Sequence, residues 1–176
     1  MRRVGSGVGM DTSSADQVVH FHQAGSHGKL VDDTSFTGKV PVVVTFALVA
    51  DLETRATFIQ GLDASLHEFG ERRVQLLVAV HGDPVAIAAG LDVQVTLMAD
   101  DGLAERLGAM PDEQGRIATV VLDNRGQAVD TVRQLPVGDH ALAVLTAFDT
   151  LAADYPDRFA VLPDDATPVA DARRVE

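Results

Sequence analysis

The sequence predicts a single α/β domain with a central mixed β-sheet, helices on its faces and an N-terminal β-hairpin. Two runs rich in β-branched and aliphatic residues, VPVVVTF at 40–46 and VQLLVAV at 74–80, are typical of strands buried on both faces of a sheet. Helical periodicity lies between them, and strand–helix–strand units imply parallel strands with right-handed crossovers. Two later strands joined by a tight turn add an antiparallel pair, so the sheet is mixed.

The first half of the chain supplies the hairpin, two strands and the longest early helix. Short apolar pieces on either side of a Gly-Ser-His-Gly turn predict a hairpin over 17–31. Apolar residues at helical spacing predict a helix over 52–70. Asp51 is a suitable N-cap, Glu53 suits the positive first turn, and Gly70 suits the end.

The second half continues the alternation and then closes the sheet. Asp83 and Pro84 predict the start of a short helix that ends near residue 89. A strand over 93–98 and a helix over 102–107 follow. A strand over 117–122 leads to a tight turn in which Gly126 can take a positive φ, and a strand over 128–132 returns. The final helix is expected over 138–153.

Charge and cysteine content exclude several classes of function. The chain has 176 residues, a formal net charge of −12 and no cysteine. An acidic surface repels phosphate backbones and anionic membranes, so neither nucleic acid nor a membrane is an expected partner. Without cysteine there is no disulfide, no thiolate metal site and no thiol chemistry.

The chain divides into a domain with two flanking segments. Residues 1–16 are rich in Gly and Ser and are expected to be a disordered leader, so that Met10 is an alternative start. Residues 17–153 form the expected domain, and 154–176 form a C-terminal extension. No secretory signal or membrane span is visible, so the cytoplasm is the expected location.

Four stretches in this order resemble the thioredoxin-like fold in its peroxiredoxin form. They are FTGKVPVVVTF at 36–46, SLHEFGERRVQLLVAVHGDP at 65–84, VTLMADDGLAERLGA at 95–109 and ATVVLDNRGQAVDTV at 118–132. The resemblance covers roughly residues 18–150. It implies a homodimer as an expected assembly, because peroxiredoxins associate along the sheet edge or through helix faces near the active site.

The resemblance also places the family's catalytic positions on this chain. The peroxidatic cysteine falls on Arg55, the threonine of its motif on Leu52 and the proline on Leu48. In the family the amides at that helix start stabilise a thiolate, whereas here Asp51 and Glu53 can occupy them. The position of the family's second arginine falls on Ile117, and Arg116 is one residue off, which in a strand changes the face. Arg116 is therefore either a partial match or a solvent-facing arginine.

Histidines supply the remaining candidates for chemistry. His81 follows a predicted core strand at the edge where open α/β sheets bind ligands, and Asp51 or Asp100 are possible orienting partners for a general base. His20, His22 and His27 are near enough along the hairpin to bind a metal ion, or are incidental exposed histidines. His67 and His140 lie on predicted helices and are interpreted as surface or interface residues. No P-loop, G-x-S-x-G or H-E-x-x-H motif is present, and no cofactor is expected.

These observations leave three hypotheses about function. The first is a cysteine-less peroxiredoxin-like protein without peroxidase activity, which acts as a binding or protein-interaction module. Leu48, Val49 and Leu52 replace polar catalytic residues with apolar ones, and with Asp51 and Arg55 they are its candidate binding residues; the alternative is that these apolar residues fill the core. The second hypothesis is an enzyme of non-redox chemistry that uses Arg55, Arg116 and His81. The third is a metal-binding protein.

Overall fold

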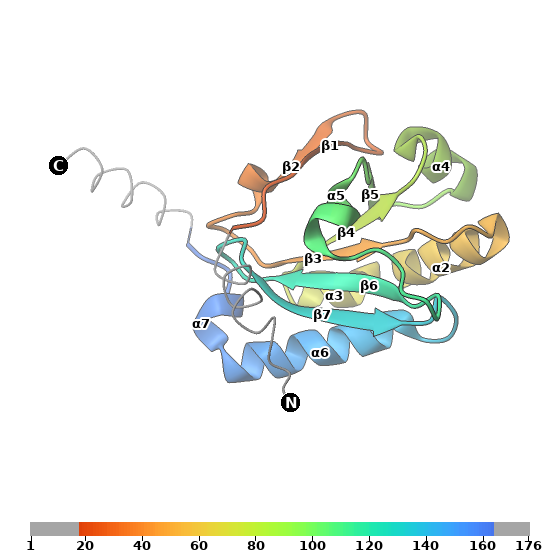
Figure 1. Cartoon of the computed structure of the whole chain (residues 1–176). Coiled ribbons are helices and arrows are strands. Elements are labelled where there is room, and N and C mark those ends of the chain that lie inside the picture. The colour runs from red at the N-terminus through yellow and green to blue at the C-terminus, as the bar shows by residue number, and fades with distance from the viewer. Residues whose placement is uncertain (1–17, 164–176) are drawn as a thin grey trace.

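A five-stranded mixed sheet forms the centre of residues 18–163, which are the residues that the computed structural model describes (Figure 1). In spatial order its strands are β5 (Thr96–Ala99), β4 (Gln75–Val80), β3 (Val42–Phe46), β6 (Ile117–Leu122) and β7 (Ala128–Gln134). β3 pairs in parallel with β4 and antiparallel with β6, so that Val44 lies opposite both Leu77 and Val120. The carboxyl ends of β3 and β4 and the amino end of β6 therefore share one edge of the sheet.

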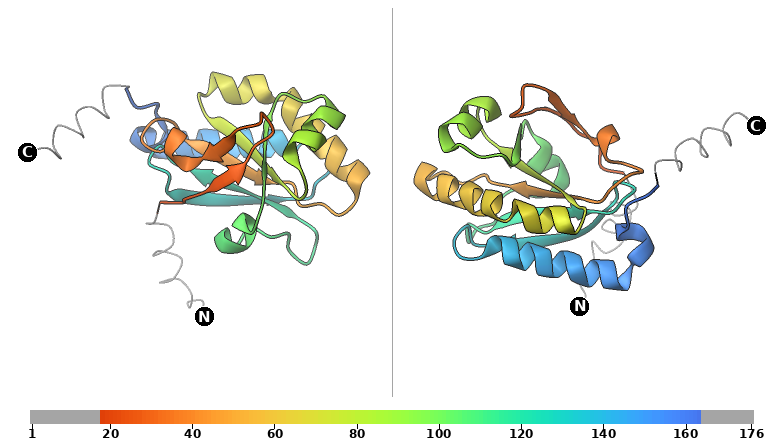
Figure 2. Two further views of the ribbon diagram at one scale, coloured as in Figure 1. Left: turned by 90° about the horizontal axis from the view of Figure 1, so that it is seen from above. Right: turned by 180° about the vertical axis from the view of Figure 1, so that it is seen from behind.

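One face of the sheet is covered by most of the helices. They are α2 (Leu52–Ala64), α3 (Leu66–Glu71), α4 (Pro84–Leu91), α6 (His140–Asp154) and α7 (Pro156–Phe159). α2 and α6 lie side by side over the sheet, as Figure 2 shows from behind. Between them and the sheet, Val43 and Val121 pack with Phe58 and Val144 in one buried cluster. All residues of β3 are buried, as its β-branched run predicts.

The opposite face is covered by shorter elements. These are the strands β1 (His22–Ala24) and β2 (Leu30–Asp32), the 3₁₀ turn η1 (Asp33–Ser35) and the helix α5 (Leu103–Leu107). β1 and β2 pair antiparallel, which confirms the predicted N-terminal hairpin. The Gln23 side-chain amide, which is buried, donates to the carbonyl oxygens of Ala99 (2.9 Å) and Asp100 (2.8 Å) and so ties the hairpin to the end of β5.

The long early helix and the third strand differ clearly from their predicted bounds. The helix expected over 52–70 is divided at Ser65 into α2 and α3. Asp63, near the end of α2, accepts hydrogen bonds from the amides of Gln94 and Val95, both at 2.8 Å. Those amides are thereby drawn out of the β4 ladder, and β5 begins at Thr96 rather than at residue 93.

The chain continues past residue 153, where the extension was expected to begin, into α7. The ring of Phe159 in α7 packs edge-on against Phe148 of α6, with 5.4 Å between centroids. The expected leader, the alternative start at Met10 and residues 164–176 lie outside the described residues. Within 18–163, none of the helices is both long and apolar enough to cross a membrane.

Candidate functional site

The resemblance described above places the family's peroxidatic position at the edge where β3 ends and α2 begins. Asp51 caps α2: its Oδ2 accepts from the Thr54 amide at 2.9 Å and from the Thr54 hydroxyl at 2.6 Å. The hydroxyl bond and then the amide bond lower the pKa of Asp51 below its usual value. A fixed carboxylate therefore occupies donors of the first turn, where a thiolate would otherwise be stabilised.

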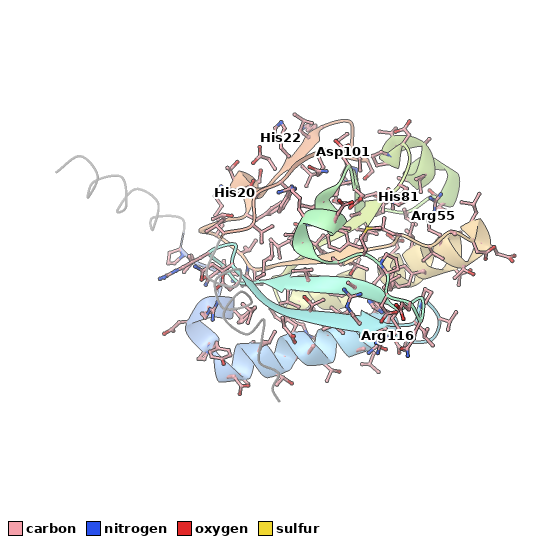
Figure 3. The ribbon with its side chains drawn as sticks, viewed as in Figure 1. His20, His22, Arg55, His81, Asp101 and Arg116 are labelled. Atoms are coloured by element: carbon pink, nitrogen blue, oxygen red, sulfur yellow. The ribbon has the colours of Figure 1, made fainter. Side chains whose placement is uncertain are left out.

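Arg55 lies in the first turn of α2, as the sequence predicted. Its amide donates to the carbonyl oxygen of Asp51 at 2.9 Å. Its guanidinium Nη1 donates to the carbonyl oxygen of His81 at 3.3 Å, which joins the start of α2 to the end of β4. Figure 3 shows Arg55 and His81 near each other at this edge. The structure therefore brings together two of the three residues expected to form a site.

His81 presents an exposed imidazole beside a buried carboxylate. Its side chain is 63% exposed, and its Nε2 lies 3.6 Å from Oδ2 of Asp100, whose side chain is 5% exposed. The other oxygen of Asp100 accepts from the Ala104 amide at 2.8 Å and so is held by the start of α5. Of the two orienting partners expected for His81, the structure places Asp100 nearest to the ring. At 3.6 Å the ring and the carboxylate are close enough for an ion-pair contact but not for a hydrogen bond.

Arg116 lies at the same edge but is engaged by a different partner (Figure 3). Its Nε donates to Oδ2 of Asp112 at 2.7 Å, and its amide donates to Oδ1 at 2.9 Å. Hydrogen bonds from the Arg116 backbone and then from its guanidinium hold the pKa of Asp112 below its usual value. Ile117 fills the buried strand position with 1% exposure, so the guanidinium stays in the loop before β6.

The three apolar residues expected as a contact patch separate into two roles. Leu48 is 8% exposed and packs in the cluster on the hairpin side of the sheet, and Val49 packs against the cluster on the helix side. Leu52 is 65% exposed on the first turn of α2. Core filling therefore accounts for Leu48 and Val49, and Leu52 is the one apolar residue of the three that is well exposed.

The three hairpin histidines each face a different neighbour. Nδ1 of His20 lies 3.0 Å from Oδ2 of Asp33, Nδ1 of His22 lies 2.6 Å from Oδ2 of Asp32, and Nε2 of His27 lies 3.4 Å from the Thr96 hydroxyl. Across residues 18–163, no group of three or more His, Cys, Asp or Glu side chains is placed to hold a metal ion. The metal hypothesis gains no geometric support from these contacts.

His140 is a residue whose role the sequence analysis missed. It was interpreted as a surface or interface residue, which is wrong, since it is only 3% exposed within the chain itself. It opens α6, four residues before the buried Val144 and eight before the buried Phe148. That helical spacing places it on the buried face and was the available signal. Its Nε2 lies 2.9 Å from the Thr119 hydroxyl, which lies 2.8 Å from the Thr45 hydroxyl.

Solved structures that are similar to this chain include peroxiredoxins. The bacterioferritin comigratory protein of Xanthomonas campestris matches with a TM-score of 0.65 and 19% sequence identity over 80% of this chain and 95% of that chain. Peroxiredoxin Q of the same organism gives a TM-score of 0.66 at 19% identity, over 80% and 94%. The mitochondrial 2-Cys peroxiredoxin of Plasmodium falciparum gives 0.63 at 17% identity, over 85% and 99%.

No protein-family model and no curated protein matches the chain. The structural likeness defines a class: the thioredoxin-like fold in its peroxiredoxin form, with a central mixed sheet and an N-terminal hairpin. This chain carries that fold without any cysteine, which confirms both the predicted fold and the absence of a catalytic cysteine.

Proposed function

We propose that this protein has no peroxidase activity and acts as a binding or protein-interaction module, with the edge around the start of α2 as its contact surface. The observation that carries the proposal is the first turn of α2. There Asp51 caps the helix and Arg55 is bonded to the His81 carbonyl oxygen. A cation and a fixed carboxylate occupy a position that a thiolate and peroxide would need.

Exposed apolar side chains at this end of the molecule support binding over simple loss of function. Leu52 on α2 is 65% exposed and Val137 in the loop before α6 is 66% exposed. Val137 and Thr54 line the same cavity, so the loop lies next to the first turns of α2. A second copy of this chain is the proposed partner, because a homodimer buries such residues symmetrically.

The absence of peroxidase activity is tested by following hydrogen peroxide with a thiol reductant present. We expect metal-free protein to consume peroxide at the rate of the buffer blank. Turnover above that blank would contradict the proposal, because it requires a redox group that the sequence lacks.

The contact surface is tested by sedimentation over a range of protein concentrations. We expect Leu52→Glu and Arg55→Ala to weaken self-association with the fold intact. Leu30→Glu serves as the matched control, because Leu30 is 59% exposed but lies on the hairpin. A wild-type protein that stays monomeric at all concentrations, or equal weakening by Leu30→Glu, would rule out this surface for a homodimer.

A second candidate function is catalysis by the His81–Asp100 pair. The observation that favours it is the exposed imidazole of His81 beside the buried carboxylate of Asp100 at the ligand-binding edge. Hydrolysis of 4-nitrophenyl acetate measures whether this imidazole is an activated base or nucleophile. We expect His81→Ala to lower the rate if it is. His67→Ala is the control, since His67 is 82% exposed and lies 3.4 Å from Glu71. Equal rates in both variants would exclude this chemistry.

A further inference from the structure

A cavity of 330 Å³ lies between α2 and the start of α6, apart from the Arg55–His81 contact. Glu53, Thr54 and Thr57 line it from α2, and the loop residues 136–139 line it from the other side. Phe58 and His140 also line it, with their rings edge to face at a centroid distance of 5.0 Å. Its size suits a small organic molecule.

His140 contributes a polar atom that the protein leaves unpaired. Its Nε2 is bonded to the Thr119 hydroxyl on β6, and its Nδ1 is buried with no hydrogen-bond partner among the described residues. A buried polar atom without a hydrogen-bond partner destabilises the folded state. Burial also lowers the pKa of His140 to about 4, so the ring is neutral near pH 7.

The threonine hydroxyls determine which of the two ring nitrogens of His140 carries the proton. If Nε2 accepts from Thr119, and Thr119 accepts from Thr45, both buried hydroxyl protons are used and Nδ1 alone stays unpaired. The reverse arrangement leaves the Thr45 proton unpaired as well as Nδ1. Because each unpaired buried group is costly, the first arrangement is favoured, and Nδ1–H is a hydrogen-bond donor.

The charges of the residues that line the cavity disfavour an anionic ligand. Glu53 and Asp139 line the cavity, and none of the described residues that line it is a lysine or an arginine. A carboxylate ligand would therefore meet two like charges. The carbonyl or amide oxygen of an uncharged molecule can accept from Nδ1–H without that repulsion.

We propose that this cavity is a binding site for a small uncharged molecule, whose carbonyl or amide oxygen accepts a hydrogen bond from Nδ1 of His140 and whose apolar part packs on Phe58. The site goes beyond the interaction surface proposed above and does not depend on it. Exposed Val137 lies at its wall and adds apolar contact. The ligand satisfies the buried imidazole nitrogen that the residues of 18–163 leave unpaired.

The test titrates the full-length protein, labelled with ¹⁵N-histidine, with three probes of one shape: benzamide, benzoate and benzylammonium. We expect benzamide to shift the His140 Nδ1 resonance in a saturable way, and benzoate to bind at least tenfold more weakly. Benzylammonium has no acceptor oxygen, so it should leave the Nδ1 resonance unshifted. Peroxidase turnover would contradict the function proposed above without affecting this result.

Two variants keep the proposal falsifiable. Thr57→Trp fills the cavity from an exposed helix position. We expect this variant to bind benzamide at least tenfold more weakly and to keep the melting temperature of the wild type. Thr150→Trp, at an exposed position of α6 outside the cavity, should bind as the wild type does. No benzamide binding up to its solubility limit, binding that leaves Nδ1 unshifted, or equal binding by Thr57→Trp would each overturn the proposal.

Discussion

His140 is a titratable ring held without charge between the sheet and the helix layer. Its Nε2 meets the Thr119 hydroxyl, its ring contacts Phe58, and burial lowers its pKa from 6.5 to about 4. Glu53 of α2 and Asp139 of the preceding loop line the adjoining cavity, but neither reverses the effect of burial. The folded protein therefore binds this proton less readily than the unfolded chain does.

The free energy of unfolding should consequently decrease as the pH is lowered through the window between these two pKa values. Because the folded-state pKa is depressed, the stabilising effect is complete above pH 6.5 and is lost as the pH falls toward 4. A shift of this size corresponds to roughly 3 kcal/mol. We expect the free energy of unfolding in urea, measured from pH 7 to 4, to fall less for His140→Phe than for wild type. His67→Phe should follow wild type, and identical slopes for all three proteins would contradict the assignment.

Asp63 joins two elements that the sequence places far apart. It lies in α2, two residues before the break at Ser65, and its Oδ1 accepts from the amides of Gln94 and Val95 just before β5. Asp63 thus holds the segment that leads into the edge strand β5 against the end of α2. This bond pattern explains why the third predicted strand starts late.

Replacing Asp63 should destabilise the domain in proportion to the hydrogen bonds lost. Asp63→Ala leaves the amides of Gln94 and Val95 without their acceptor, and we expect a loss of about 1–3 kcal/mol in the free energy of unfolding. Asp63→Asn keeps an oxygen acceptor and should lose less. Urea denaturation of the two variants measures the difference. An Asp63→Ala protein as stable as wild type would show that these bonds add nothing to stability.

The last described residues of the chain are bonded to the turn between β6 and β7. The Asn124 side-chain amide donates to the carbonyl oxygens of Asp157 at 2.8 Å and Ala160 at 2.9 Å. Nε of Arg158 donates to Oδ2 of the buried Asp123 at 2.8 Å. Residues that the sequence placed in an extension therefore complete the packing of the helix-covered face.

Truncating Phe159 tests whether this segment belongs to the cooperative domain. Phe159 is 5% exposed against Phe148, and we expect Phe159→Ala to cost about 3–5 kcal/mol, as large-to-small core substitutions do. Val161→Ala is the control, because Val161 is 38% exposed. Thermal and urea unfolding measure the stability of both variants against wild type. Equal stability of the two would place the domain end before α7.

Local patterns in the sequence were sufficient for the order of elements and for the position of Arg55. β-branched runs such as that of β3 are buried because both faces of the sheet are covered, and Asp51 and Asp83 cap their helices as their position before apolar periodicity predicted. Gly126 takes a φ of +81° in the tight turn. Helix starts and turns depend on neighbours in the chain, so they could be predicted without the fold.

Partners distant along the chain could not be predicted in this way. Arg116 binds Asp112 instead of joining Arg55, and Leu48 is buried whereas Leu52 is exposed, although both are leucines near the start of one helix. Which face of the sheet a loop residue meets depends on the elements packed there. The contacts of the candidate residues were therefore only partly predictable from the sequence.

The sequence by itself determined that this protein has no thiol chemistry and that its strands and helices alternate as in a peroxiredoxin, because composition and periodicity are properties of the chain alone. Only the tertiary structure decided that His140 is buried against Thr119 and that a cavity opens beside it. The reason is that spacing along α6 can place His140 on a buried face, but its hydrogen-bond partner and the cavity exist only once α6 and α2 pack on the sheet.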